Sequence, residues 1–250
     1  KNITTFLPPN IELRQIAKFL DIKTTQFDTI ISKKELLVNK LEEAKKSLIS
    51  EVVTGKVKII DGKMVPRQPD EMKDSGVEWL GLIPKDWKVS KLGYITTKIT
   101  DGSHISPDTE EGLYPFVSVK DLKKHQIDFE NCLLTSTKSY KYLMRNACNP
   151  RAKDVLISKD GTIGQTTVID FTKQFVVASS LVIITPDRSV DSYYLEYVLN
   201  SNYFQEQIKM LTKGAALPRL SIVRLKNCRT LYTKSWDEQM TIVRFLDEKV

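Results

Sequence analysis

Cysteine and histidine are scarce in this sequence. Its 250 residues include three cysteines, Cys132, Cys148 and Cys228, and two histidines, His104 and His125. An odd number of cysteines without a Cys-x-x-Cys pair does not indicate a disulfide framework, and it favours a reducing, cytoplasmic setting. Structural zinc sites draw on several Cys and His ligands, so we expect no metal site.

A long apolar run is also absent. No stretch approaches the roughly 18 apolar residues that a membrane-spanning helix needs, so we expect no membrane contact. The first residues, Lys-Asn-Ile-Thr-Thr-Phe, are too few and too polar for a secretory signal. The hydrophobic fraction of 41% is usual for a folded chain. The length suits one large domain or two small ones.

Acidic residues are missing between Lys209 and Lys234. The whole chain has 38 Lys+Arg and 31 Asp+Glu, which gives a formal net charge of +7. The positive charge of that one stretch therefore equals the net charge of the whole chain. Its seven basic residues are Lys209, Lys213, Arg219, Arg224, Lys226, Arg229 and Lys234. Such a concentration indicates either a solvated basic face or contact with a polyanion such as nucleic acid.

Sequence signatures of catalysis are absent as well. The chain has no Gly-x-x-x-x-Gly-Lys-[Ser/Thr] phosphate loop and no Gly-x-Gly-x-x-Gly dinucleotide motif. Asn149-Pro150-Arg151-Ala152 lacks the aromatic residue with which amino-methyltransferases stack a flipped base. Pro107-Asp108, with Glu110-Glu111, lacks the acid-x-Lys continuation of metal-dependent nucleases. We therefore expect no catalytic residues and no cofactor.

Apolar residues three and four apart predict a long helix from about Asn10 to Val53, within a spacer of residues 10–55. Prolines precede it and a glycine follows it, and Thr24-Thr25 is a candidate break. An apolar stripe of this length needs a partner helix, as in a coiled coil. The stripe residues expected to form that interface are Phe27, Ile31, Leu37, Leu41 and Leu48.

The chain after this helix changes character twice. Residues 56–76 contain Asp61-Gly62 and prolines, which predicts a polar linker. Residues 77–234 predict a loop-rich α+β domain. Its expected strands lie at residues 114–119, 155–158, 166–169 and 175–184. A helix over residues 191–211 is expected next, and then a loop to Ser221 and a strand through Leu225.

The two ends of the chain share sequence. Residues 238–249 and 12–23 are identical at six of twelve positions, at a constant offset of 226. Ser235-Trp-Asp-Glu238 also has the Ser-x-x-Glu spacing of a capping box, in which each end residue bonds the other's backbone amide. We interpret residues 235–250 as the start of a second copy of the long helix, and residues 1–9 as the end of a preceding unit.

Three polar loops of the α+β domain could form a binding surface. Residues 213–221 lie in the basic stretch, and their glycine and alanines let a partner approach the backbone. Residues 99–107 carry many short hydrogen-bonding side chains, and residues 158–161 predict a hairpin turn. Turn formation explains each loop alone. Together with the concentration of charge, the loops favour a nucleic-acid surface.

Seven segments follow one another in an order that has a counterpart in a known family. Residues 15–21 and 48–55 are similar to the two ends of a conserved family helix. Residues 73–87 (Lys-Asp-Ser-Gly-Val-Glu-Trp-Leu-Gly-Leu-Ile-Pro-Lys-Asp-Trp) are very similar to the family's lead-in to a recognition domain. Shorter matches follow at residues 100–104, 158–161, 214–221 and 238–243. On these segments the chain resembles the specificity (S) subunit of type I restriction–modification systems.

The resemblance implies a non-catalytic subunit for recognition of double-stranded DNA. In the family, two target recognition domains read the halves of a split DNA target, and two long helices pack as an antiparallel coiled coil between them. Methylation subunits, which bind S-adenosylmethionine, dock on the S subunit, and restriction subunits join through them. This sequence has one such domain, so we interpret it as a fragment or as a half-subunit that dimerises through residues 10–53.

The same resemblance, applied to the three loops, implies the residues that contact DNA. Arg219 offers a rigid fork suited to guanine edges or phosphate. The full set of expected DNA-binding residues is Asp101, Ser103, His104, Lys159, Lys213, Arg219 and Ser221. Two other functions remain open from sequence. One is a coiled-coil scaffold with a protein-binding domain, and the other is a stand-alone DNA-modifying enzyme.

Overall fold

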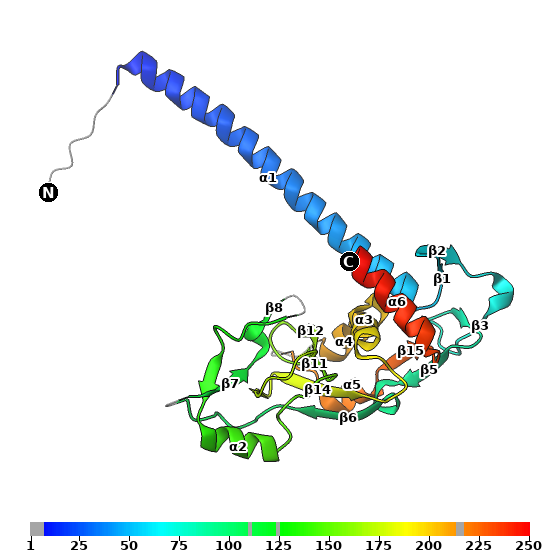
Figure 1. The fold of residues 1–250 in the computed structure, drawn as a ribbon. Coiled ribbons are helices and arrows are strands. Elements are labelled where there is room, and N and C mark those ends of the chain that lie inside the picture. Colours follow the sequence, from blue (N-terminus) through cyan, green and yellow to red (C-terminus); the bar gives the residue numbers. More distant parts are fainter. Residues whose placement is uncertain (1–7, 110–111, 124–125, 214–217) are drawn as a thin grey trace. The chain divides into compact units, whose positions relative to one another are not determined.

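The structure, a computed structural model, describes residues 8–109, 112–123, 126–213 and 218–250 (Figure 1). It consists of two units, Lys1–Lys45 and Lys46–Val250. Most of the expected remnant at residues 1–9 lies outside the described residues, as do Glu110-Glu111, His125 and residues 214–217 of the loop at residues 213–221. The predicted α+β class is confirmed: helices accompany several small sheets.

The long helix α1 (Asn10–Val53) is confirmed as one continuous helix. The expected break at Thr24-Thr25 is wrong, because Thr25 Oγ1 donates to the carbonyl of Asp21 at 2.8 Å and stays within the helical turn. In the first unit the stripe is exposed, with Phe27 at 62% and Leu41 at 61% of full exposure. Leu48 differs from the other stripe residues, because it packs on the core of the second unit beside Ile49.

The segment predicted as a linker forms short hairpins that belong to the second unit. β1 (Val57–Ile60) pairs with β2 (Lys63–Pro66) through a turn in which Asp61 and Gly62 have φ of 48° and 69°. Positive φ at both positions is the geometry of a type I′ turn, which Asp-Gly favours. A turn η1 (Pro69–Glu71) leads to the hairpin of β3 (Met72–Asp74) and β4 (Leu82–Pro84).

The centre of the second unit is an antiparallel four-stranded sheet. Its strand order is β12 (Thr166–Val168), β11 (Val155–Ser158), β14 (Leu181–Pro186) and β6 (Thr96–Asp101). Residues that alternate along a strand point to opposite faces. Val155 and Ile157 therefore join one apolar cluster with the helices, and Leu156 joins a second cluster with Phe175. Both faces of β11 are buried, which explains its uninterrupted apolar sequence.

A second, three-stranded sheet belongs to the same unit. Its order is β10 (Leu133–Thr135), β7 (Tyr114–Val117) and β13 (Val176–Val177), and the β7–β13 pair is parallel. The helix α2 (Thr137–Arg145) packs on this sheet through Tyr140 and Leu143. The remaining short elements of the second unit are η2 (Leu92–Tyr94), η3 (Val119–Asp121), β8 (Leu122–Lys123) and β9 (Gln126–Ile127).

Three predicted elements need correction. The helix expected over residues 191–211 is two helices, α3 (Ser192–Asn200) and α4 (Asn202–Thr212), separated by Ser201. The strand expected through Leu225 is a helix, α5 (Ile222–Asn227), capped by the hydroxyl of Ser221. Residues 175–184 form the separate strands β13 and β14, which belong to different sheets.

The last helix, α6 (Trp236–Lys249), is capped by Ser235 as expected. Ser235 Oγ accepts from the backbone amide of Glu238 at 3.3 Å. The Glu238 carboxylate instead bonds Arg67 and the buried indole of Trp87. β15 (Arg229–Tyr232) precedes α6 and pairs with β5 (Lys88–Lys91). No helix among the described residues has the length and apolar character needed to cross a membrane.

Candidate nucleic-acid interface

The loop after β6 is shaped by a close approach of two backbones. A Cβ at Gly102 would lie 2.2 Å from the carbonyl oxygens of Val177 and Ala178, so only glycine fits there. Ser103 is buried next to it, and its hydroxyl donates to the Ile105 carbonyl at 2.6 Å. The Ser103 side chain, which we expected to contact DNA, is thus bonded within the turn. Asp101 and His104 remain as the candidate DNA-contacting side chains of this loop.

Asp101 contacts two of the other expected residues. Its Oδ2 lies 2.5 Å from Lys159 Nζ and 2.7 Å from His104 Nε2. The Lys159 side chain is 5% exposed, whereas the His104 side chain is 60% exposed. Burial raises the pKa of the Asp101 carboxyl, but Lys159 and His104 outweigh that effect and lower its pKa overall. Lys159 is therefore a buried partner of Asp101, and His104 is the solvent-facing member.

Arg219 forms an ion pair with the tip of the β11–β12 loop. Arg219 Nε lies 2.9 Å from Asp160 Oδ1, and Arg219 Nη2 donates to Asp160 Oδ2 at 3.0 Å. The amide of Leu220 donates to the Lys159 carbonyl at 3.0 Å, and the Leu220 side chain is fully buried. This anchor brings the loop before α5 against the turn at Lys159 and Asp160, far from it in sequence.

These contacts form what we call the charged row, which consists of His104, Asp101, Lys159, Asp160 and Arg219. It unites four of the seven expected residues and adds Asp160, which the sequence did not single out. Ser221 caps α5 by accepting from the Arg224 amide at 3.2 Å. Lys213 is exposed at the end of α4, and its ammonium group pairs with none of the described residues.

The basic stretch 209–234 is partly neutralised by the fold. Lys209 pairs with Glu206 at 2.5 Å, and Arg219 pairs with Asp160. Arg224 Nη1 donates to the Leu211 carbonyl at 2.6 Å and so satisfies the end of α4. Arg224 and Lys226 lie on a helix, not on the expected strand. Fewer free positive charges remain here than the sequence suggested.

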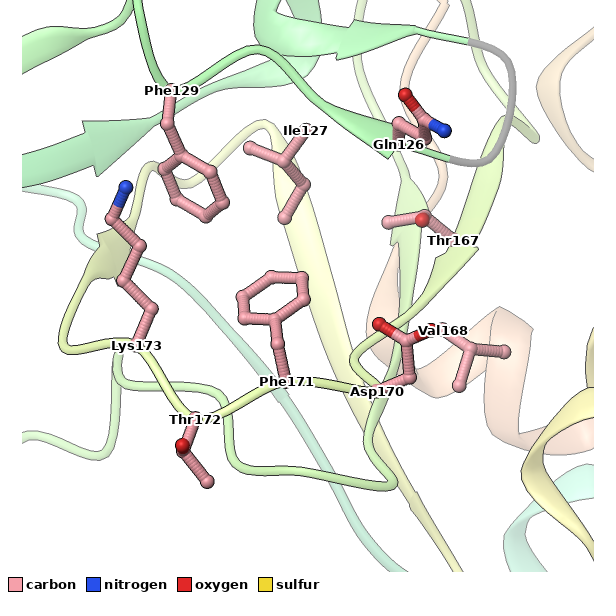
Figure 2. A pocket seen from close by; sticks show the side chains of 9 residues that line it. All are labelled: Gln126, Ile127, Phe129, Thr167, Val168, Asp170, Phe171, Thr172 and Lys173. Carbon is pink, nitrogen blue, oxygen red and sulfur yellow. The ribbon is translucent and has the colours of Figure 1, made fainter.

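One pocket shares no lining residue with the charged row. It encloses about 620 Å³ and is lined mainly by the β9 region and residues 167–173. Figure 2 shows the Phe171 ring at its centre and the Lys173 side chain rising toward Phe129. Lys173 Nζ is 4.0 Å from the Phe129 ring centre, and Asp170 accepts from the Tyr193 hydroxyl at 2.9 Å. Its two charged groups thus have partners within the fold.

A smaller pocket adjoins the charged row. It encloses about 260 Å³ between the loop from Thr100 to Ile105 and the end of α2, and is lined there by Tyr142 of the helix and by Asn146, which follows it. Sequence reasoning did not select α2, although its basic residues are visible in the sequence. Within the described ranges, no three His, Cys, Asp or Glu side chains are grouped so that they could hold a metal ion.

Comparison with known proteins gives one family. The model for the type I restriction modification DNA specificity domain matches residues 84–248. The chain is 24% identical over 247 residues to the type I restriction enzyme EcoBI specificity subunit of Escherichia coli, covering 97% of this chain and 50% of that relative. It is 26% identical over 200 residues to the MjaIX specificity subunit of Methanocaldococcus jannaschii, covering 74% of this chain and 42% of that relative. The chain thus spans about half the length of these curated relatives.

Solved structures share the fold. One comes from a study of the structural basis of complex assembly and conformational transition of the type I R-M system. It matches with a TM-score of 0.59 and 18% identity, over 97% of this chain and 52% of that chain. The crystal structure of the HsdS subunit from Thermoanaerobacter tengcongensis matches with a TM-score of 0.53 and 19% identity, over 97% and 51%. Because the family model covers well over half of the sequence, this chain belongs to the type I restriction modification DNA specificity domain family.

Proposed function

We propose that this chain is a non-catalytic recognition subunit, or part of one, that reads one half of a bipartite double-stranded DNA target. The observation that carries the proposal is the family match over residues 84–248, which covers almost all of the expected recognition domain at residues 77–234. The charged row adds support, because it gathers polar side chains from three loops at one end of the central sheet. Loops on a rigid scaffold are common sites of recognition.

Arg219 is the residue best suited to a base. Its side chain is 55% exposed, and Asp160 holds the guanidinium in one orientation. A planar guanidinium can bond the O6 and N7 of guanine in the major groove. His104 faces solvent from the neighbouring loop. Lys213 suits contact with a phosphate, and such a contact positions the protein on DNA without specifying the sequence.

The partners in this proposal are methylation subunits and, through them, restriction subunits. In the first unit, α1 exposes the apolar residues Phe27, Ile31, Leu37 and Leu41, which suit a second helix. That helix could come from the rest of a longer subunit, from a second copy of this chain or from a methylation subunit. The chemistry would then reside in the partner subunits, with residues 10–55 as spacer and 235–250 as the start of the second helix.

The test is DNA binding and methylation by the chain with and without methylation subunits. Binding titrations at several salt concentrations should give a log affinity that falls linearly with log salt, since basic residues release counterions from DNA. With methylation subunits, sequencing of methylated sites should give one defined sequence. Failure to bind duplex DNA even in that complex would favour the scaffold, and methylation by the chain alone would favour the enzyme.

A further inference from the structure

The helix α2 carries a basic face that lies outside the charged row. Lys138, Lys141 and Arg145 are exposed at spacings of three and four, so they share one side of the helix, with Tyr142 at its edge. The buried residues Tyr140 and Leu143 lie on the opposite side. We call this surface, made by Lys138, Lys141, Tyr142 and Arg145, the α2 basic face.

Its positive charge is not offset by acidic residues nearby in the sequence. From Asn131 to Lys153 the sequence has five basic residues and no Asp or Glu: Lys138, Lys141, Arg145, Arg151 and Lys153. Acidic residues elsewhere in the chain cancel this positive charge, so the net charge of the whole chain does not reveal it. In the part of the chain that the structure describes, none of the three helix cations forms an ion pair. Among the described residues, these three cations therefore have no acidic partner that an anionic ligand would have to displace.

The helix beneath the face is firmly held. Ser136 caps its start by accepting from the Ser139 amide at 3.3 Å, and Asn146 Nδ2 donates to the Tyr142 carbonyl at its end. Tyr140 stacks on Tyr114 with ring centres 3.9 Å apart and planes at 6°. A rigid helix presents its cations at fixed spacing, so little additional ordering is needed when a partner binds.

The α2 basic face borders the charged row. Tyr142 and Asn146 form one wall of the 260 Å³ pocket, and Asp101 and His104 line the other side. A ligand that contacts His104 is thereby close to Tyr142. Lys138 and Arg145 are about 10 Å apart along the helix axis at ~1.5 Å per residue. Phosphates of one DNA strand recur about every 3.4 Å of duplex axis, so a face of this length can reach more than one of them.

We infer that the α2 basic face holds backbone phosphates next to the base pairs read by the charged row. The inference rests on the proposed function, since it takes double-stranded DNA as the ligand. Lys and Arg supply the charge, and a Tyr hydroxyl is a common donor to phosphate oxygens. Contacts of this kind strengthen binding to every sequence and set the position of the domain on the duplex, while the loops choose the target.

The experiment removes the three charges and keeps the helix. The variant Lys138→Gln/Lys141→Gln/Arg145→Gln is assembled with methylation subunits and titrated against a target duplex and a scrambled duplex. We expect affinity for both to fall by at least about tenfold at 0.1 M salt, and the slope of log affinity against log salt to shrink by about 2–3. The ratio of the two affinities should stay unchanged.

A matched control removes three exposed lysines from the N-terminal hairpins of the same unit. Lys56→Gln/Lys63→Gln/Lys85→Gln loses the same charge in a region that is well separated from α2 in Figure 1. Its affinity and salt slope should match those of the unaltered chain. An equal loss in both variants would mean that only net charge matters, which overturns the inference.

The remaining outcomes separate the inference from the proposed function. If the unaltered complex binds no duplex DNA, the proposed function fails. If it binds DNA and the α2 variant binds equally well, only the inference fails. A loss confined to the target duplex would make α2 a reader of sequence and overturn the phosphate role. A variant that no longer joins methylation subunits on a sizing column would instead place α2 in a protein interface.

Discussion

Arg219 and Asp160 form a doubly bonded ion pair, with Nε 2.9 Å from Oδ1 and Nη2 3.0 Å from Oδ2. The pair has two consequences for DNA recognition. It fixes the plane of the guanidinium before any DNA arrives, which lowers the entropic cost of a bidentate contact. It also occupies two of the five N–H donors, so a base would be read by the others or by exchange with the carboxylate.

Replacing Arg219 by alanine should alter sequence choice. A lost bidentate contact should cost about 1–3 kcal/mol in affinity for the target and relax one position of it. The measurement is DNA binding and methylated-site sequencing with the reconstituted complex. Lys226→Ala, at an exposed lysine of α5, is the control, and it should leave the methylated sequence unchanged. Unaltered affinity and methylated sequence in Arg219→Ala would remove Arg219 from the readout.

Asp101→Asn should destabilise the second unit in a pH-dependent way. The buried ammonium of Lys159 would lose its counter-charge, at a cost of about 1–3 kcal/mol at pH 7. Because Lys159 and His104 lower the pKa of Asp101, its contribution exists above the unfolded pKa of about 3.9 and is lost as pH falls through the lower folded value. Urea unfolding should therefore show a difference at pH 7 that shrinks below about pH 3.9.

The control for that measurement is an exposed carboxylate. Asp86→Asn should change the free energy of unfolding by less than about 0.5 kcal/mol, as surface substitutions usually do. If Asp101→Asn behaved in the same way at pH 7, the ion pair with Lys159 would contribute nothing to stability.

The elements predicted well from sequence are those with a long, regular pattern. α1 repeats its apolar spacing over 44 residues, and β11 begins with the apolar run Val155–Ile157. α5 was missed because it is one short turn of helix whose first residues, Ile222 and Val223, are β-branched and favour strands. The Ser221 cap was a weak local signal against that choice.

The charged row could be predicted only as separate loops. Asp101 meets Lys159 because β14 lies between β6 and β11, an order that tertiary packing sets. Asp160 was overlooked because nothing local links it to Arg219. The α2 basic face was visible as an acid-free stretch, but the net charge of the whole chain concealed it. Residues 214–217 lie outside the described residues, so the predicted role of the glycine and alanines there stays a prediction.

The bond from Trp87 to Glu238 predicts a second stability effect. The indole Nε1 donates to Oε2 at 2.9 Å, and Arg67 pairs with the other carboxylate oxygen. Glu238→Ala would leave two largely buried donors without an acceptor, at about 2–3 kcal/mol, whereas Glu238→Gln keeps an acceptor and should cost less. Unfolding free energies measure both. Glu248→Ala, at an exposed position of α6, should be neutral, and a neutral Glu238→Ala would contradict the argument.

The apolar stripe of α1 predicts how assembly can be broken. Leu41 is 61% exposed in the first unit, so Leu41→Asp should leave the chain folded, with unchanged helix content by circular dichroism. A carboxylate in an apolar helix seam must be desolvated, which costs several kcal/mol. Leu41→Asp should therefore abolish joining to a partner helix or to methylation subunits on a sizing column. Ser32→Asp places the same charge on the opposite side of α1 and should assemble normally. Intact assembly of Leu41→Asp would show that the stripe is not the interface.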